Sequence, residues 1–245
     1  PADDLNMINM AARSLLIETR TSLILIDTGL GDKQSEKFFS HYYRWGEHCI
    51  DSSIKKAGFK NGDITDVFFT HLHFDHCGGA IIRRGGRLIP RFENANFWIN
   101  KDHWSWATSP NLREKASFLP DNILPLKESG KLHLISDGEK PLGLDFLTVS
   151  GHTEKMMLPF IEFKNKTIVF VSDLIPTATH LRVPFIMGYD TRPLLTLREK
   201  RLFLEKAAKD KFLLFLQHDV KNEVIDIRKE NNKFKLNKTF KLENI

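Results

Sequence analysis

Four side chains of the kinds that bind metal ions stand within six residues, in the order His71-x-His73-x-Asp75-His76. They come directly after the apolar residues 67–69, which end a predicted strand. Neutral imidazoles and carboxylates are the ligands that a zinc-like ion accepts at about 2 Å. The dense grouping of these side chains therefore predicts a metal site at the end of that strand.

Three further donors follow predicted strands later in the chain, namely His152, Asp173 and His218. Loops at strand ends meet at one edge of a sheet and commonly carry function, so we expect these side chains to join the first four. Two ions held about 3.5–4 Å apart form a clamp for hydrolysis. Seven donors, with one carboxylate between the ions, suit such a pair, and the sequence thus predicts a dinuclear site.

The spacing inside the first group divides its donors between the two ions. His71 and His73, two residues apart in an extended loop, can face one ion, while Asp75 and His76, after a sharp turn, can face the other. The pair Gly78-Gly79 lets the backbone turn away into the next segment.

The remaining histidines and the cysteines are interpreted as structural. His41, His48, His103 and His133 stand alone in the sequence and are expected on the surface or in the core. Cys77 is interpreted as a small residue in the turn before the glycines, not as a ligand or nucleophile. Two cysteines are too few for a disulfide scaffold, which indicates reduced thiols and a cytoplasmic location.

Short apolar runs alternate with amphipathic stretches, which predicts mixed α/β or α+β layers. Strands are expected over residues 14–17, 22–26, 66–69, 96–99, 132–135, 144–149, 159–163, 167–171, 211–216, 223–228 and 233–242. Helices are expected over residues 34–57, with a break near Gly46, and over 101–107, 112–118 and 195–209. We find no internal repeat and no linker rich in glycine or serine, so residues 1–245 are predicted to form a single domain.

The positive charge is concentrated near the C-terminus. Residues 228–245 hold six cationic and two acidic side chains, which gives +4 of the formal net charge of +5. Their alternation predicts a hairpin that turns at Asn231-Asn232, with a buried face and a solvated lysine face. Because the rest of the chain is nearly neutral, we expect no nucleic-acid groove, and the absence of a run of about 18 apolar residues predicts no membrane span.

With these residues in place, the chain resembles the metallo-β-lactamase fold superfamily of metallohydrolases. The resemblance covers residues 11–219 and rests on "LILIDTGLGD" (residues 23–32), "THLHFDHCGG", "SGHT", "SD" and "QHD". It implies a four-layer αββα sandwich with the metal site at one edge of the sheets. It also implies further strands before residue 11, and hence residues before Pro1.

The resemblance assigns the donors to two divalent ions. His71, His73 and His152 would hold the first ion. Asp75, His76 and His218 would hold the second, with Asp173 bridging. Zinc is the expected metal, and manganese, iron and cobalt suit the same nitrogen and oxygen donors.

Within the superfamily, the chain is most similar to the acyl-homoserine lactone lactonases and the methyl parathion hydrolase branch. The similarity rests on "HLHFDH" with Phe74, on residues 172–190 and on the aromatic-rich segment of residues 96–125. Classical β-lactamases have Cys at the position of Asp173, and glyoxalase II has a helical C-terminal domain where a hairpin is predicted here. The resemblance therefore implies a quorum-quenching lactonase with a small-molecule substrate, and the related lactonases imply a homodimer.

Two features depart from the lactonase pattern. Leu174, Ile175 and Pro176 follow Asp173, where many lactonases have a Tyr that holds the substrate carbonyl. His180 or Tyr189 is a candidate for that role. The common "GHTPG" is "GHTEK" here.

The expected mechanism is attack of a metal-bound hydroxide on a lactone or ester carbonyl. Asp75 is the expected catalytic group and carries a proton to the leaving alkoxide. An acyl chain requires an apolar wall, for which the candidates are Phe74, Phe185, Ile186, Met187 and Tyr189. The alternatives are an organophosphate or aryl esterase, a glyoxalase II-like thioesterase and a metal-binding protein without turnover.

Overall fold

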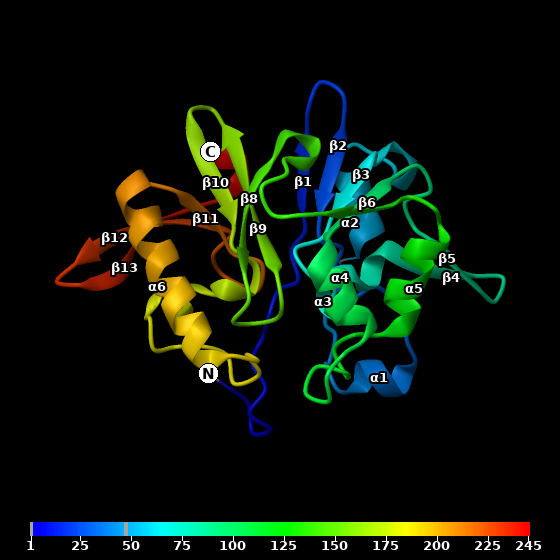
Figure 1. The fold of residues 1–245 in the computed structure, drawn as a ribbon, viewed down its shortest axis with the longest axis horizontal. Helices are drawn as coiled ribbons and strands as arrows, with labels where there is room; N and C mark the ends of the chain where they lie inside the picture. Colours follow the sequence, from blue (N-terminus) through cyan, green and yellow to red (C-terminus); the bar gives the residue numbers. More distant parts are fainter. Residues whose placement is uncertain (1, 47–48) are drawn as a thin grey trace. The chain divides into compact units, whose positions relative to one another are not determined.

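The computed structural model describes residues 2–46 and 49–245. The chain is divided into an N-terminal unit, Ser14–Ile135, and a C-terminal unit made of Pro1–Arg13 and Ser136–Ile245. Each unit is built on its own β-sheet with helices beside it (Figure 1). This mixture of strands and helices confirms the predicted α/β class, whereas the single domain stays a prediction.

The sheet of the N-terminal unit has the order β1-β2-β3-β6-β7 within the described residues. Its strands are β1 Leu15–Glu18, β2 Leu23–Ile26, β3 Asp66–Phe68, β6 Asn96–Asn100 and β7 Leu132–Ile135. Strands β2, β3, β6 and β7 run parallel, and β1 pairs antiparallel with β2. All four residues of β2 are buried, as expected for a strand inside a parallel sheet whose two faces are covered.

Short helices connect these strands. They are α1 Glu36–Ser40, α2 Ile50–Lys56, α3 Phe74–Cys77, α4 Lys101–Thr108 and α5 Pro120–Glu128, with the 3₁₀ turns η1 Asn61–Asp63 and η2 Gly78–Ala80. A hairpin of β4 Ile81–Arg84 and β5 Arg87–Pro90 turns at Gly85 and Gly86, which both have positive φ (Figure 1). Two such residues match the right-handed twist of a tight hairpin.

The carboxyl ends of the parallel strands carry the polar side chains of this unit. Asp27 follows β2, Thr70 and the donor motif follow β3, and Asn100 ends β6 and caps α4. Neighbouring parallel strands end at the same edge of a sheet, where ligands of α/β proteins bind. The topology therefore places the first donor group where the sequence predicted it.

Close backbone packing holds the loop after β2 against the end of the donor motif. A Cβ atom on Gly78 would collide with the carbonyl of Leu30, and one on Gly79 would collide with the carbonyl of Thr28. The Gly79 N–H donates to the carbonyl of Gly29 at 3.0 Å. The glycines after His76 are thus required by this contact between two backbones as well as by the turn.

The sheet of the C-terminal unit has the order β13-β12-β11-β10-β9-β8 within the described part of the chain. Its strands are β8 Asp145–Val149, β9 Met156–Phe163, β10 Lys166–Phe170, β11 Leu213–Phe215, β12 Val224–Glu230 and β13 Lys233–Phe240. The pair β10–β11 is parallel and the other pairs are antiparallel. Asp173 and His218 follow the two parallel strands and therefore leave the sheet at one edge.

Helix α6, Pro193–Asp210, covers this sheet (Figure 1). Phe203, Leu204 and Ala207 on α6 belong to a buried apolar cluster with residues of the sheet strands. The remaining elements of the unit are the 3₁₀ turns η3 Pro141–Gly143, η4 Ser172–Leu174, η5 Ala178–Leu181 and η6 Leu242–Asn244.

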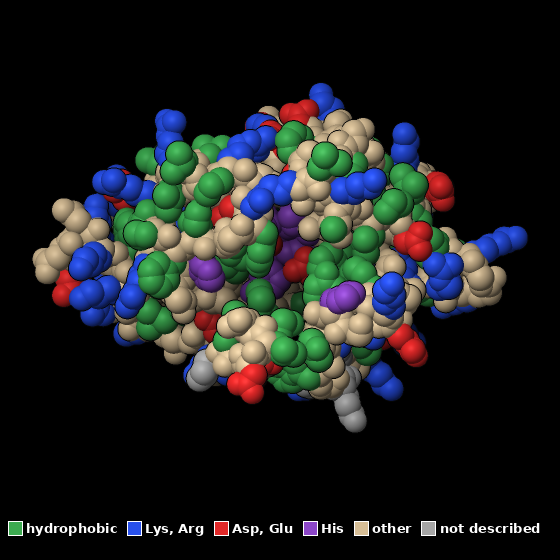
Figure 2. All heavy atoms as spheres, turned by 90° about the horizontal axis from the view of Figure 1, so that it is seen from below, with side chains coloured by type: hydrophobic (Ala, Val, Ile, Leu, Met, Phe, Trp, Pro, Cys, Tyr) green, Lys and Arg blue, Asp and Glu red, His purple; other side chains and the backbone are tan. Residues whose placement is uncertain are grey.

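The C-terminal hairpin confirms its prediction. Strands β12 and β13 turn at Asn231 and Asn232, whose φ angles of 48° and 59° are the left-handed values that such a turn needs. Phe234 is buried, and the lysines at 233 and 235 are exposed. Figure 2 shows Lys and Arg side chains gathered on this hairpin, at the left edge of the view.

The helix predictions were confirmed in part. Residues 34–57 hold two short helices, α1 and α2, on either side of the predicted break near Gly46, and positions 47–48, with His48, lie outside the described residues. The helix predicted over residues 112–118 was wrong: this segment forms turns, in which the Asn111 side chain accepts hydrogen bonds from the Arg113 and Glu114 backbone N–H groups. Helix α5 was not predicted; it begins at Pro120, a position that proline favours, and it also contains Pro125.

Over residues 2–46 and 49–245, no helix combines the length and the apolar character that a membrane crossing requires.

We expect Gly79→Ala to lower the free energy of unfolding by about 3 kcal/mol, because the new methyl group meets backbone atoms that cannot move aside. Urea unfolding followed by tryptophan fluorescence measures the loss. Gly62→Ala is the matched control, since its Cβ would lie at an ordinary 3.6 Å from side-chain atoms of Asn94 and Glu93. Equal stability of the two variants would contradict the packing argument.

Candidate metal centre

Two imidazoles of the N-terminal unit face each other at a distance suited to one ion. His71 and His73 are buried, and Nε2 of His71 lies 3.1 Å from Nδ1 of His73. Nitrogens that bind a single ion at about 2.0–2.1 Å lie roughly 3–3.5 Å apart. His71 and His73 can therefore share an ion through these two atoms, as the spacing predicted.

Asp27 orients two of the histidines from behind. Its Oδ1 accepts the Thr70 N–H at 2.8 Å, and its Oδ2 accepts the Thr70 hydroxyl and lies 2.8 Å from Nδ1 of His76. Because the Thr70 hydroxyl donates to Asp27, its oxygen, 3.1 Å from Nδ1 of His71, can accept a hydrogen bond from that ring. Both rings consequently carry their proton on Nδ1 and present Nε2 as the ligand atom.

Asp75 and His76 form the second donor pair of this unit. Both lie on the single-turn helix α3, and Nε2 of His76 is 3.6 Å from Oδ2 of Asp75. The Asp75 side chain is 27% exposed, whereas that of His76 is fully buried. Asp75 is thus a carboxylate that can be a ligand and still reach solvent.

Buried cations hold the backbone just after α3. The Lys33 ammonium donates to the Gly78 carbonyl at 2.5 Å, and the Arg91 guanidinium donates to the Gly79 carbonyl at 2.8 Å. Arg91 also pairs with Asp32 and Asp51. Cations near the end of a helix complement its negative terminus, and here they fix the segment that follows His76.

Asp173 is bracketed by two histidines in the C-terminal unit. Its Oδ2 lies 3.1 Å from Nε2 of His152, and its Oδ1 lies 3.0 Å from Nε2 of His218. All three side chains are at most 6% exposed. Each carboxylate oxygen thus has its own imidazole beside it, which is the arrangement that a bridging ligand needs.

The other nitrogen of each of these rings is also held. Nδ1 of His152 lies 2.9 Å from Asp190, and Nδ1 of His218 lies 2.7 Å from the carbonyl of Ala11. Burial alone lowers the pKa of His152, but the carboxylates of Asp173 and Asp190 outweigh it and raise that pKa to about 9. Both rings present Nε2, the usual result of an acceptor behind a metal-binding histidine.

The structure therefore places all seven predicted donors at strand ends, four in one unit and three in the other. Nitrogen and oxygen donors with oriented rings fit divalent zinc-like ions. Sequence reasoning missed the residues behind the rings, Asp27 and Asp190. Both stand inside segments that carried the family resemblance, so the resemblance contained the signal.

Phe74, a predicted substrate-binding residue, lies in an aromatic cluster whose other two members were not predicted. Its ring centroid is 5.3 Å from that of Phe38 and 4.8 Å from that of Tyr42. Phe38 belongs to α1, and Tyr42 follows it in the sequence. Because Phe74 precedes Asp75, this cluster gives the donor motif an aromatic neighbour suited to apolar groups.

The other substrate-binding candidates are spread over residues 180–189 of the C-terminal unit. Tyr189 is 58% exposed, and its ring centroid is 6.1 Å from that of His152. Nδ1 of His180 lies 2.8 Å from the Thr177 hydroxyl, and burial lowers the pKa of His180. Phe185 is exposed, Ile186 is half-buried and Met187 is buried. Of these five, Tyr189 is the one whose ring contact with a predicted donor is seen directly.

The "GHTEK" departure has a local explanation. Lys155 has a φ of 50°, a left-handed value that glycine in the common "GHTPG" adopts without strain. Glu154 pairs with Arg192 at 2.6 Å, and Lys155 pairs with Asp137. Two ion pairs thus accompany the backbone conformation at the positions of the usual proline and glycine.

Helix α6 also holds the backbone just before His152, through the side chain of Glu199. The two oxygens of Glu199 accept the N–H groups of Ser150 and Gly151 at 2.8 and 2.9 Å. These residues directly precede His152, so Glu199 fixes the approach of the backbone to that ring.

The interpretations of Cys77, His103 and His133 agree with the structure. Burial raises the pKa of the Cys77 thiol to about 12, which disfavours the thiolate that a nucleophile or a metal ligand requires. His103 is buried and its Nε2 accepts the Leu72 N–H at 2.9 Å. His133 stacks on Trp98 with ring centroids 4.3 Å apart.

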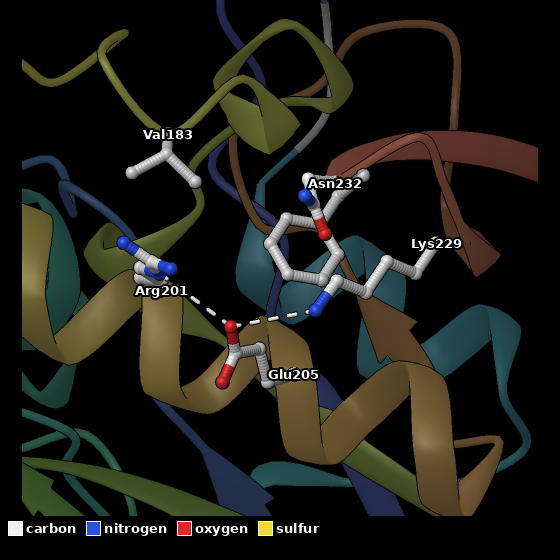
Figure 3. A pocket seen from close by; sticks show the side chains of 6 residues that line it. Val183, Arg201, Glu205, Lys229 and Asn232 are labelled. Carbon is white, nitrogen blue, oxygen red and sulfur yellow. Dashed lines mark hydrogen bonds and ion pairs between the residues drawn. The ribbon is translucent and has the colours of Figure 1, made fainter.

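A pocket of about 270 Å³ on the C-terminal unit holds none of the predicted site residues (Figure 3). Its carboxylate, Glu205, already pairs with Arg201 and Lys229 at 3.5 Å each. The lining offers no set of donors for a metal and is not a candidate active site.

Comparisons with known proteins agree with the donor pattern. Residues 10–218 match the family model described as the metallo-β-lactamase superfamily. An N-acyl homoserine lactonase from Bacillus cereus is 26% identical over 231 residues, which cover 89% of this chain and 85% of that protein. These matches confirm the resemblance predicted from the sequence.

Solved structures agree as well. A probable metal-dependent hydrolase from Staphylococcus aureus has a TM-score of 0.86 at 27% identity, covering 98% of this chain and 87% of that chain. AidC, a dizinc quorum-quenching lactonase in complex with a product, has a TM-score of 0.79 at 25% identity, covering 96% and 82%.

Lys33 makes stability depend on pH. Burial lowers the pKa of Lys33 from 10.5 to about 8, so between these values the unfolded chain binds more protons than the folded one. Its contribution to the free energy of unfolding therefore rises as the pH increases from about 8 to about 10.5. We expect Lys33→Met to flatten this rise in urea unfolding measured across that range. Parallel profiles for wild type and variant would contradict the assignment.

Proposed function

The chain belongs to the metallo-β-lactamase superfamily and is a metallohydrolase; on that premise we propose that it opens the lactone ring of N-acyl homoserine lactones. The proposal is supported by the lactonase relatives at 26% identity and by the donor groups of the two units. Cleavage of the ring ester would release the open-chain acyl-homoserine.

We assign the seven donors to two divalent ions. His71, His73 and His152 would hold one ion, and Asp75, His76 and His218 would hold the other, with Asp173 shared between them. Zinc is the expected metal, since imidazoles and carboxylates are its usual ligands. The observation that carries the assignment is the bracketing of Asp173, whose two oxygens lie 3.1 and 3.0 Å from the Nε2 atoms of two different histidines.

When bound, such a pair of ions supplies Lewis acidity toward the carbonyl and an activated water. The chain supplies orientation and proton transfer. Asp27 and Asp190 hold His76 and His152 by their Nδ1 atoms. Asp75, whose side chain is 27% exposed, would carry a proton from the attacking water to the alkoxide oxygen that is freed when the ring C–O bond breaks, which gives the hydroxyl of the open-chain product.

The acyl chain of the substrate is assigned to the aromatic cluster of Phe38, Tyr42 and Phe74. These ring centroids lie within 5.3 Å of one another, and Phe74 directly precedes Asp75 in the sequence. Burying each methylene of an acyl chain against apolar side chains contributes about 0.8 kcal/mol. The cluster therefore favours substrates with long acyl chains over short ones.

The first test is hydrolysis of a substrate panel by the zinc- and manganese-loaded protein. The panel holds short- and long-chain acyl-homoserine lactones, a γ-lactone, methyl paraoxon, a nitrophenyl ester, lactoylglutathione and a cephalosporin. We expect preference for the acyl-homoserine lactones, loss of turnover with a chelator and recovery on adding metal. Faster turnover of methyl paraoxon, lactoylglutathione or the cephalosporin would leave a metallohydrolase but overturn the lactonase proposal.

The variant Asp173→Ala tests whether turnover depends on the metal that the seven donors are assigned to hold. This variant should lose bound metal and turnover together, because the shared carboxylate is gone. Asp145→Ala is its control, since Asp145 is a 63% exposed aspartate of the same unit. Full turnover by Asp173→Ala without bound metal would contradict the assignment.

Tyr42→Ala should weaken the preference for long acyl chains. We expect kcat/KM for a decanoyl substrate to fall about tenfold, with little change for a butanoyl substrate, since only the long chain reaches the missing ring. Tyr43→Ala is the control, because Tyr43 is 60% exposed. Equal losses for both chain lengths would argue against an acyl site at this cluster.

A further inference from the structure

We infer that Glu114 is the positioning residue for His73 and that it sets the affinity of the metal centre. The inference rests on the proposed function, since it takes His73 as a metal ligand. Glu114 is 3% exposed, and its Oε1 lies 3.4 Å from Nε2 of His73. Its place in the chain did not single it out, because it stands more than 35 residues after the donor motif in a stretch predicted as a helix.

Residues 111–118, which we call the 111–118 loop, pack against the donor motif. The Phe74 N–H donates to the Ser117 carbonyl at 2.9 Å. The ring of Phe118 packs on that of His73, with centroids 4.8 Å apart. Together with Glu114, these contacts join the loop to two successive residues of the motif, which makes its conformation part of the site.

The Glu114 carboxylate is fixed from its other side. Its Oε2 accepts the Trp106 indole N–H at 2.7 Å and the Asn111 amide N–H at 2.6 Å. The backbone N–H of Glu114 donates to the Asn111 side chain at 3.1 Å. Because two donors hold Oε2, the carboxylate has a fixed orientation, and its Oε1 stays directed toward His73.

The contact decides which nitrogen of His73 carries the proton. Nδ1 of His73 faces Nε2 of His71 at 3.1 Å, so Nδ1 is the atom that can share an ion with His71. Binding there requires the proton on Nε2, the atom that faces Oε1 of Glu114 at 3.4 Å. His73 is thus the opposite tautomer from His71, His76, His152 and His218, whose Nδ1 atoms face acceptors.

Glu114→Gln tests this with the smallest change in shape. Trp106 and Asn111 require an acceptor, so the amide oxygen of the new side chain takes the place of Oε2. Its NH₂ group then faces Nε2 of His73, where the metal-binding tautomer also has a hydrogen. Two donors face each other, and the ring can bind an ion only against that repulsion.

The experiment measures zinc affinity of the full chain by competition with a chromogenic chelator, for wild type, Glu114→Gln and the control Glu128→Gln. Glu128 is an exposed glutamate of the same unit. We expect Glu114→Gln to bind one of two zinc ions roughly 10–100-fold more weakly, and Glu128→Gln to equal wild type. Histidine ¹⁵N NMR of the zinc-loaded wild type should show one ligand ring protonated on Nε2, and this signal should be lost in Glu114→Gln.

The outcomes separate this inference from the proposed function. Zinc affinity of Glu114→Gln within twofold of wild type overturns the role of Glu114 and leaves the function standing. A lower melting temperature of the metal-free variant with unchanged zinc affinity does the same, because it shows a purely structural role. Wild type that takes up no zinc overturns both.

Trp106→Phe covers the case in which Glu114→Gln does not fold. It removes one of the two donors that fix Oε2 while the aromatic ring stays in place. A smaller loss of zinc affinity, with the Nε2-protonated ring retained but broadened, supports the positioning role. Wild-type affinity and an unchanged NMR signal overturn it.

Discussion

The buried carboxylate of Asp27 is the constraint on which the donor geometry of the N-terminal unit depends. It accepts hydrogen bonds from the Thr70 backbone and hydroxyl and lies 2.8 Å from Nδ1 of His76. Through Thr70 it also sets the tautomer of His71. Asp27 has a φ of 54°, and an aspartate tolerates this left-handed conformation better than most residues. One side chain at the end of β2 therefore orients rings that follow β3.

That orientation is maintained by backbone packing just after the motif. The loop after β2 lies so close to Gly78 and Gly79 that neither position has room for a Cβ atom. Lys33 and Arg91 donate to the carbonyls of the same two glycines. Burying the Lys33 ammonium costs free energy, as its lowered pKa shows. The unit tolerates this cost where the backbone must stay fixed after α3.

The C-terminal unit orients its metal-binding imidazoles with different groups. Asp190 lies behind His152, the Ala11 carbonyl lies behind His218, and Glu199 on α6 holds the backbone that leads to His152. A metal-binding imidazole needs an acceptor for its second nitrogen, and any buried oxygen with the right direction serves. This freedom explains why the groups behind the rings differ between the two units, although the ligands in both follow strands.

The sequence by itself determined the donor types, their places after strands, the α/β class and the hairpin at Asn231-Asn232. These follow from local patterns of one or a few neighbouring residues. Only the tertiary structure decided which residues stand behind the rings. Asp27 is 49 positions from His76, and Glu114 belongs to a stretch that periodicity wrongly predicted as helix. Local patterns cannot identify such pairs, because a buried side chain finds its partner through the packing of whole elements.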